Sequence, residues 1–263
     1  MNPSSDSFLL IAGPCAVESQ SIIMDTASAL QELCDELSIP LLFKSSYRKA
    51  NRSRLDSFSG IGDDKALAIL RQVKSELGLP ITTDIHESTE LDVVSEIIDV
   101  LQIPAFLCRQ TALLVAAAET GKIVNVKKGQ FMAPSAMEFV AEKLRATSPD
   151  QEVWLTERGT TFGYGDLVVD FRGIVEMKDH CDRVVMDCTH SLQRPNSASG
   201  VTGGQPEYIS LMARTAIAAG ADALFIETHP DPSAALSDGA NMLPLSEMRT
   251  VLESALKVKS AVS

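Results

Sequence analysis

The sequence has few basic and few aromatic residues, which argues against two kinds of partner. It has 23 basic side chains against 35 acidic ones, so its net charge of −12 disfavours nonspecific binding to nucleic acid or to an anionic membrane. Aromatic residues make up 5% of the chain, and Trp154 and the three tyrosines form no stripe on which bases could stack. We therefore expect neither a nucleic-acid partner nor a membrane partner.

Cysteines and long apolar runs are also scarce. The five cysteines are an odd number without a Cys-x-x-Cys pair, which argues against a disulfide framework or a structural zinc knuckle. The longest apolar runs fall far short of the roughly 20 residues that a membrane-spanning helix needs. The amino terminus has no basic stretch followed by an apolar one, so no secretory signal is predicted and a cytoplasmic location is expected.

What is present is a globular composition, 45% hydrophobic and 22% charged, arranged as alternating β-rich runs and helical segments. The predicted strands are Phe8–Gly13, Pro40–Ser46, Pro80–His86, Val100–Pro104, Ile123–Lys128, Val153–Gly159, Arg183–His190 and Ala223–His229. The predicted helices are Ser21–Leu37, Asp63–Leu77, Glu90–Ile98, Arg109–Thr120, Ser135–Ala146, Asp170–Cys181, Pro206–Ala219 and Leu245–Lys259. Eight such units predict a single-domain (β/α)₈ (TIM) barrel over residues 1–263. A doubly wound open sheet is less favoured, because no Gly-x-Gly-x-x-Gly follows the first strand.

Alternate residues of a strand face opposite sides, and here the two sets differ in polarity. One set is polar near the strand ends: Gly13/Cys15, Lys44/Ser46, Asp84/His86, Gln102, Asn125/Lys127, Thr156/Arg158, Cys188/His190 and Glu227/His229. The other set is mostly apolar and is expected to pack beneath the helices. The polar set is therefore predicted to face the carboxyl-terminal opening, where barrel enzymes place their chemistry.

Basic residues gather at these strand ends, although the whole chain is acidic. They are Lys44, Lys49, Arg52, Arg54, Arg109, Lys127, Lys128 and Arg158. Arg and Lys are the usual ligands of phosphate and carboxylate groups, so the pattern predicts a substrate with more than one anionic group. By strand parity, Lys44, Lys127 and Arg158 are expected to face the site, whereas Arg54 and Lys128 are expected to be solvated surface charges.

A second group combines a thiol, an imidazole and a carboxylate. In a closed barrel the eighth strand lies between the seventh and the first, so Cys15, His190 and Glu227 should converge although they are far apart in sequence. Such a set suits Zn²⁺, Fe²⁺, Mn²⁺ or Co²⁺, with Asp238 in the following loop as a fourth ligand. By parity Cys188 is placed near His190, which predicts a second thiol that makes the site prone to oxidation. The small residues of Ser197–Gly204 predict a lid over this metal, or a connector.

Seven segments resemble the 3-deoxy-D-manno-octulosonate 8-phosphate synthases, and the resemblance runs from Phe8 to about Leu245. They are Gly13–Ser19, Lys44–Ser46, Lys49–Ser53, Thr83–Glu87, Gln102–Gln110, Asn125–Gln130 and Thr156–Gly159. Enzymes of that family are homotetrameric (β/α)₈ barrels that condense phosphoenolpyruvate with D-arabinose 5-phosphate and release phosphate, on the route to lipopolysaccharide. The related 3-deoxy-D-arabino-heptulosonate 7-phosphate synthase, which uses erythrose 4-phosphate, typically has Lys-Pro-Arg-Thr where this chain has Lys49–Ser53.

The resemblance also implies roles for individual residues. A cysteine at position 15 is similar to the metal-dependent class, so one divalent metal ion is expected, with Cys15, His190, Glu227 and Asp238 as its ligands. Phosphoenolpyruvate would be held by Lys44, Ser46, Lys49, Gln102, Lys127 and Arg158. The sugar phosphate would be held by Asn51, Arg52, Ser53 and Asp84, with Arg109 reaching in from a neighbouring subunit. Lys44, Lys49, His190 and Asp238 are the expected catalytic residues.

Two other functions remain open from the residues alone. A Schiff-base aldolase would also use an inward lysine at a barrel strand end, and Lys44 or Lys127 could serve. A metal set and so many basic residues would then be unexplained. A barrel that binds sugar phosphates without catalysis is disfavoured, because a binding protein does not need an open metal site.

Overall fold

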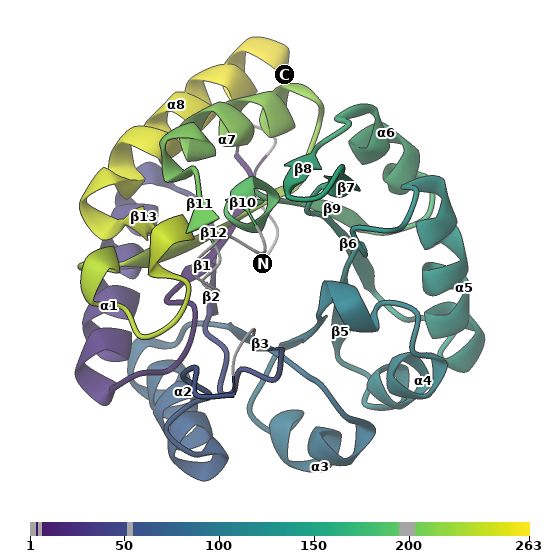
Figure 1. Ribbon diagram of the computed structural model, residues 1–263, viewed down its shortest axis with the longest axis horizontal. Helices are drawn as coiled ribbons and strands as arrows, with labels where there is room; N and C mark the ends of the chain where they lie inside the picture. Colours follow the sequence, from purple (N-terminus) through teal and green to yellow (C-terminus); the bar gives the residue numbers. More distant parts are fainter. Residues whose placement is uncertain (1–3, 5–6, 52–54, 195–202) are drawn as a thin grey trace.

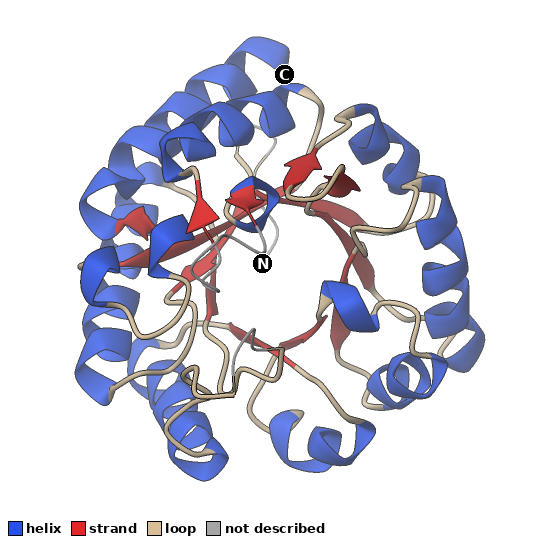
Figure 2. Ribbon diagram, viewed as in Figure 1, coloured by secondary structure: helices blue, strands red, loops and turns tan. Residues whose placement is uncertain are grey.

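In the computed structural model, which describes residues 4, 7–51, 55–194 and 203–263, eight parallel strands close into a barrel (Figures 1 and 2). In order around the barrel they are β1 (Leu9–Gly13), β2 (Leu41–Lys44), β3 (Ile81–Asp84), β4 (Val100–Ile103), β5 (Ile123–Lys127), β6 (Val153–Glu157), β9 (Arg183–Asp187) and β12 (Ala223–His229). Pairing of β12 with β1 completes the circle. The predicted (β/α)₈ barrel is confirmed.

Among the described residues, eight helices form the outer ring around these strands (Figure 1). They are α1 (Gln20–Leu37), α2 (Asp63–Leu77), α3 (Leu91–Val94), α4 (Thr111–Glu119), α5 (Glu138–Thr147), α6 (Arg172–Lys178), α7 (Ile209–Ala218) and α8 (Met248–Val262). Helix α3 is shorter than predicted, because the amides of Ile97 and Ile98 both donate to the Val94 carbonyl and close the helix with a turn. Within the described part of the chain, no helix is both long and apolar enough to span a membrane.

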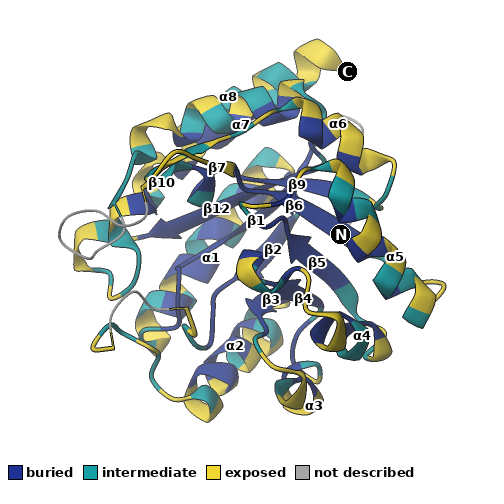
Figure 3. Cartoon of the chain, turned by 45° about the vertical axis from the view of Figure 1, so that its right-hand side comes forward, coloured by how far each residue is buried: buried dark blue, intermediate teal, exposed yellow. Residues whose placement is uncertain are grey.

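The core has two layers, separated by the wall of the barrel. Outward-facing strand residues such as Leu10 and Phe43 pack beneath the helices in the larger apolar cluster. Inside the barrel lies a smaller apolar cluster: Leu9, Ile11, Leu42, Val100, Trp154, Val185, Ala223 and Phe225. The eight barrel strands are buried except at Ile123 and Arg183, which are partly exposed, whereas the helices expose their outer faces (Figure 3). This inner apolar cluster therefore fills the amino-terminal part of the barrel and leaves the carboxyl-terminal end to polar side chains.

Short elements follow the strands at this end. A hairpin of β7 (Thr160–Phe162) and β8 (Asp166–Val168) follows β6, and the 3₁₀ helix η4 (His190–Leu192) follows β9. Strand β10 (Gln193–Arg194) pairs with β11 (Gly203–Gly204), and β13 (Leu243–Pro244) extends beside the end of β12. These elements form the rim around the opening of the barrel.

Candidate active site

The ends of β1, β2 and β12 bring the first group of polar residues together. At Gly13, with φ +154°, an added Cβ would lie 2.1 Å from the Lys44 carbonyl oxygen, so glycine permits the close approach of β1 and β2. The Lys44 ammonium lies inside the barrel, 2.6 Å from Glu227 Oε1 and 3.7 Å from Asp84 Oδ2. Burial favours the neutral forms, but these opposite charges raise the pKa of Lys44, so its ammonium persists in the buried site.

Asp84 links β2 to the strands that follow. Its carboxylate accepts hydrogen bonds from Ser46 Oγ at 2.5 Å and from Gln102 Nε2 at 2.6 Å. Lys49 Nζ in turn donates to Ser46 Oγ at 3.0 Å. Asn125 donates to Gln102 Oε1 at 3.3 Å, which carries the network on to β5. One continuous set of hydrogen bonds therefore fixes the side chains on this half of the opening.

On the other half of the barrel opening, Asp187 links neighbouring side chains as Asp84 does on the first half. Its Oδ2 lies 2.7 Å from Lys127 Nζ and 2.8 Å from His190 Nδ1, and its Oδ1 accepts the backbone N–H groups of Thr189 and His190. Beneath them, the Phe225 ring centroid lies 3.7 Å from Lys127 Nζ. Burial alone would raise the pKa of Asp187, but the adjacent His190 and Lys127 hold it well below its ordinary range. Asp187 is thus a buried carboxylate that orients a lysine and a histidine together.

Three of the four predicted metal ligands lie in one cluster. The ligand atoms of Cys15, Glu227 and Asp238 are all within 4.8 Å of one another. His190 lies beside them, with Nε2 at 3.4 Å from Glu227 Oε2 and 3.7 Å from Asp238 Oδ2. Glu227 Oε2 is buried and has no hydrogen-bond partner, so it is available to a ligand. A thiol, an imidazole and two carboxylates at this spacing fit a transition-metal ion.

The charges of this cluster also favour a cation. Burial, followed by the charge of Glu227, raises the pKa of the Cys15 thiol to about 12. Burial and the charge of Glu227 likewise raise the pKa of Asp238 above its ordinary value. The negative forms of these side chains therefore repel one another, and a bound cation would remove that repulsion and release the thiol proton.

Two comparisons with known proteins place the chain in a family. A sequence profile of the DAHP synthetase I family matches residues 2–263. The chain belongs to this family. It is 48% identical to the 2-dehydro-3-deoxyphosphooctonate aldolase of Cyanothece sp. over 97% of this chain and 93% of that protein. Proteins of the same name from Legionella pneumophila (strain Corby) and Koribacter versatilis are 51% and 50% identical, over 93% and 97% of this chain and 89% and 92% of theirs.

That name denotes the enzyme class to which the sequence motifs pointed, so the predicted resemblance is confirmed. The remaining predicted site residues of this family member differ in their burial. Arg158 is buried and donates to Gln193 Oε1 at 2.8 Å, and Gln193 in turn donates to Asp238 at 2.8 Å. Asn51 and Arg109 are exposed. Arg52 and Ser53 lie outside the described residues, as does the predicted lid except for Gly203–Gly204.

Two predictions about single residues were wrong. Cys188 lies in the outer apolar layer and donates to the Met186 carbonyl, so it is on the opposite side of β9 from the metal cluster. The residue of β9 that faces inward is Asp187, which the sequence interpretation missed. Val185 faces the barrel interior, and Asp187 is two residues further along the same strand. Alternation counted from Val185 would therefore have placed Asp187 on the inner face. Lys128 is fully buried behind the site and is not a solvated surface charge.

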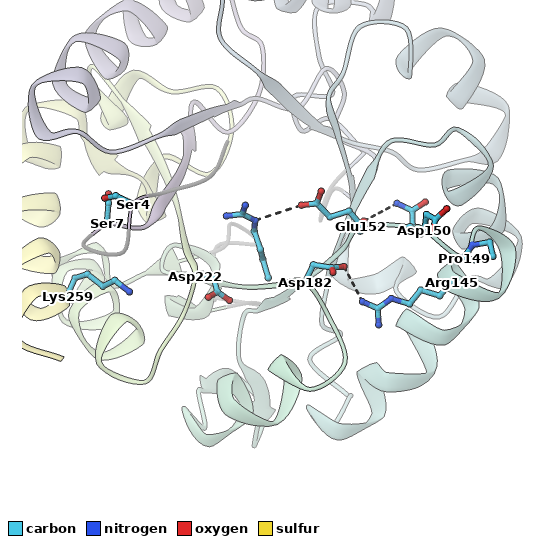
Figure 4. Close-up of a pocket in the computed structure, with 11 residues that line it drawn as sticks. Ser4, Ser7, Arg145, Pro149, Asp150, Glu152, Asp182, Asp222 and Lys259 are labelled. Carbon is cyan, nitrogen blue, oxygen red and sulfur yellow. Dashed lines mark hydrogen bonds and ion pairs between the residues drawn. The ribbon is translucent and has the colours of Figure 1, made fainter. Parts of the chain in front are cut away.

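A cavity of about 630 Å³ lies at the opposite, amino-terminal end of the barrel. Polar and charged residues line most of it, among them Glu152, Asp182 and Asp222, which directly precede β6, β9 and β12. Asp182 and Asp222 accept the backbone N–H groups of Val153 and Val184 there, and Arg145 pairs with Asp182 (Figure 4). Since these charges cap strands and pair with one another, this end is structural.

Proposed function

We propose that this protein condenses phosphoenolpyruvate with D-arabinose 5-phosphate and water to give 3-deoxy-D-manno-octulosonate 8-phosphate and phosphate, for lipopolysaccharide biosynthesis. The observation that carries the proposal is the position of the buried cations Lys44 and Lys127 beside a cysteine, histidine and carboxylate cluster. The names of relatives about 50% identical to this chain support the same reaction.

Phosphoenolpyruvate has a phosphate and a carboxylate, and both need cationic partners. Lys44 and Lys127 end β2 and β5 and Arg158 directly follows β6, and Lys49, Ser46 and Gln102 add hydrogen-bond donors around them. In this arrangement the cations offset the repulsion between two phosphorylated substrates and hold the C3 carbon against the aldehyde. Asp84, Asn51, Arg52, Ser53 and a neighbouring subunit's Arg109 would then bind the sugar phosphate.

One divalent metal ion, Zn, Fe, Mn or Co, would be held by Cys15, His190, Glu227 and Asp238. When bound, it would supply Lewis-acid chemistry, polarising the aldehyde or lowering the pKa of a water molecule. The chain itself prepares this position, because Asp187 Oδ2 lies 2.8 Å from His190 Nδ1 and directs Nε2 towards the carboxylates.

The reaction requires C3 to attack the aldehyde, water to add at C2 and the C2–O bond to break with loss of phosphate. Lys127 and Arg158 would hold the departing phosphate. Either Glu227 or the less buried Asp238 would accept the proton of the attacking water. Gln193 and Asn241 donate to the two oxygens of Asp238 and fix its orientation.

We also propose that the protein is a homotetramer in the cytoplasm. Large aromatic side chains are exposed in the segments after β4, β5 and β6: Phe106, Phe131, Phe139, Phe162 and Tyr164. Exposed apolar patches of this kind commonly contact another chain. Light scattering would test this proposal, since a monomeric mass at micromolar concentration contradicts it.

The deciding experiment measures phosphate release from phosphoenolpyruvate with arabinose 5-phosphate and, separately, with erythrose 4-phosphate, each with and without a chelator. We expect release with the five-carbon sugar alone, abolished by the chelator and restored by a divalent metal. The erythrose 4-phosphate arm is needed because the matching profile carries the DAHP synthetase name. Release with erythrose 4-phosphate alone would move the protein to the seven-carbon reaction, and borohydride trapping of substrate on a lysine would favour the aldolase.

A further inference from the structure

A lysine and a glutamate are completely buried just outside the barrel wall, behind the substrate cations. Lys128 follows β5 and Glu157 ends β6, and their side chains are 0% and 2% exposed. Lys128 Nζ lies 3.3 Å from Glu157 Oε1. Both point away from the barrel interior, so neither can touch a substrate bound inside it.

The Lys128 ammonium is surrounded by oxygen atoms of two chain segments. It donates to the carbonyl oxygens of Gly129 at 3.5 Å, Met132 at 3.3 Å and Gly159 at 3.3 Å, and to Thr160 Oγ1 at 3.1 Å. Glu157 Oε1 accepts the backbone N–H of Gly159 at 2.6 Å. The pair therefore joins the loop after β5 to the turn that begins the β7–β8 hairpin.

This pair is a poor way to gain stability. Burial lowers the pKa of Lys128 and raises that of Glu157, in each case against the attraction of the partner. Dehydration therefore opposes the charged form of each residue, and buried ion pairs are often replaced by apolar residues without loss of stability. The role of the Lys128–Glu157 pair therefore lies in the backbone geometry that it fixes.

That geometry concerns Lys127 and Arg158. Lys127 contacts Asp187 and Arg158 donates to Gln193, which places both side chains on the other side of the wall from Lys128 and Glu157. Gly159 has a φ of +87°, and its N–H is held by Glu157 while its carbonyl is held by Lys128. The turn directly after Arg158 is thus fixed at both backbone polar groups of Gly159.

We propose that Lys128 and Glu157 are positioning residues that hold the Lys127 and Arg158 side chains at the spacing the phosphoenolpyruvate site requires. This inference rests on the proposed function, because it takes Lys127 and Arg158 as ligands of that substrate. The pair acts through the backbone of β5 and β6 and through the turn at Gly159.

The test compares Lys128→Met, Glu157→Gln and the double variant with wild type. A displacement of Lys127 or Arg158 by a fraction of an ångström should raise the KM for phosphoenolpyruvate about tenfold or more, because substrate alignment is that sensitive. The KM for arabinose 5-phosphate and the bound metal per chain should stay within about twofold of wild type, by the same reasoning. Lys74→Met is a matched control, since Lys74 pairs with Asp99 at 2.7 Å away from the opening.

The double variant separates positioning from stability. It leaves no unpaired buried charge, so we expect its melting temperature to lie closer to that of wild type than that of either single variant, while the KM for phosphoenolpyruvate remains raised. A double variant with wild-type KM, or variants that lose stability without a selective change in that KM, would overturn the inference.

Calorimetric binding of phosphoenolpyruvate to wild type is measured in parallel. Binding without turnover contradicts the proposed function alone and leaves variant affinities as the readout, whereas no binding contradicts both.

Discussion

The Asp187→Asn substitution isolates the carboxylate that links the proposed phosphate and metal sites. Asparagine has nearly the same shape and can keep the acceptor for the backbone N–H groups of Thr189 and His190. It replaces the oxygen that lies 2.7 Å from Lys127 Nζ and 2.8 Å from His190 Nδ1 with a group that cannot accept from either. The substitution therefore removes orientation and charge while leaving the volume unchanged.

The magnitude follows from burial. Asp187 has no exposed side-chain surface, and Lys127 has 8%. Removal of one partner from such a buried pair costs about 3 to 5 kcal/mol of unfolding free energy. Loss of the carboxylate behind a metal-binding histidine typically weakens metal binding by about 10- to 100-fold. We expect both effects, measured by urea unfolding and by competition for the metal with a chelator of known affinity.

Asp182→Asn provides a matched control at the other end of the barrel. Asp182 also accepts a backbone N–H, that of Val153 at 2.8 Å, and pairs with Arg145, but its side chain is 47% exposed. The same substitution there should cost about 1 kcal/mol or less, because an exposed pair contributes little, and should leave metal affinity unchanged. Wild-type metal affinity in Asp187→Asn, or an equal loss in Asp182→Asn, would refute the orienting role.

Three further outcomes are expected. Cys15→Ala should retain little metal after dialysis, as measured by elemental analysis, because it removes the only sulfur ligand; activity that survives in chelator would exclude Cys15 as a ligand. The pKa of Asp84 would be raised by burial but is held well below its ordinary range by Lys44, so its folding contribution is present above the unfolded pKa of about 4 and lost as the pH falls through and below that value. Urea unfolding should therefore show a steeper acid loss of stability in wild type than in Asp84→Asn, and parallel curves would contradict this. Cys188→Ala and wild type should lose activity at the same rate in peroxide, because Cys188 is buried in the outer core; protection by the substitution would reinstate a thiol beside the metal cluster.

Strand parity predicted much of the site because it depends only on local backbone geometry. Lys44, Gln102, Lys127 and Glu227 all lie on the inner face as expected. Parity was wrong where the strand ended earlier than assumed: β9 stops at Asp187, and the 3₁₀ helix η4 begins at His190. Alternation does not hold between Asp187 and His190, so counting back from the inward-facing His190 assigned Cys188 to the wrong side.

Burial of charge was harder to predict, because it depends on what covers a residue. Lys128 stands beside Lys127 in the sequence, and nothing in its local pattern distinguishes a solvated lysine from a buried one. The loop after β5 and the turn at Gly159 supply the oxygen atoms that enclose its ammonium, and Glu157 supplies the opposite charge. These partners come from different parts of the chain, so only the folded structure shows them together.

The sequence by itself determined the barrel, its order of strands and the residue types available at its opening. Those features follow from hydrophobic periodicity and from the alternation of side chains along each strand, which are local properties. Closure of the predicted barrel also indicated that Cys15, His190 and Glu227 converge, but only the tertiary structure decided the other contacts. It placed Asp187 between Lys127 and His190, put Cys188 outside the wall and enclosed Lys128 with Glu157, because such contacts are fixed by closure of the sheet and by packing of distant loops.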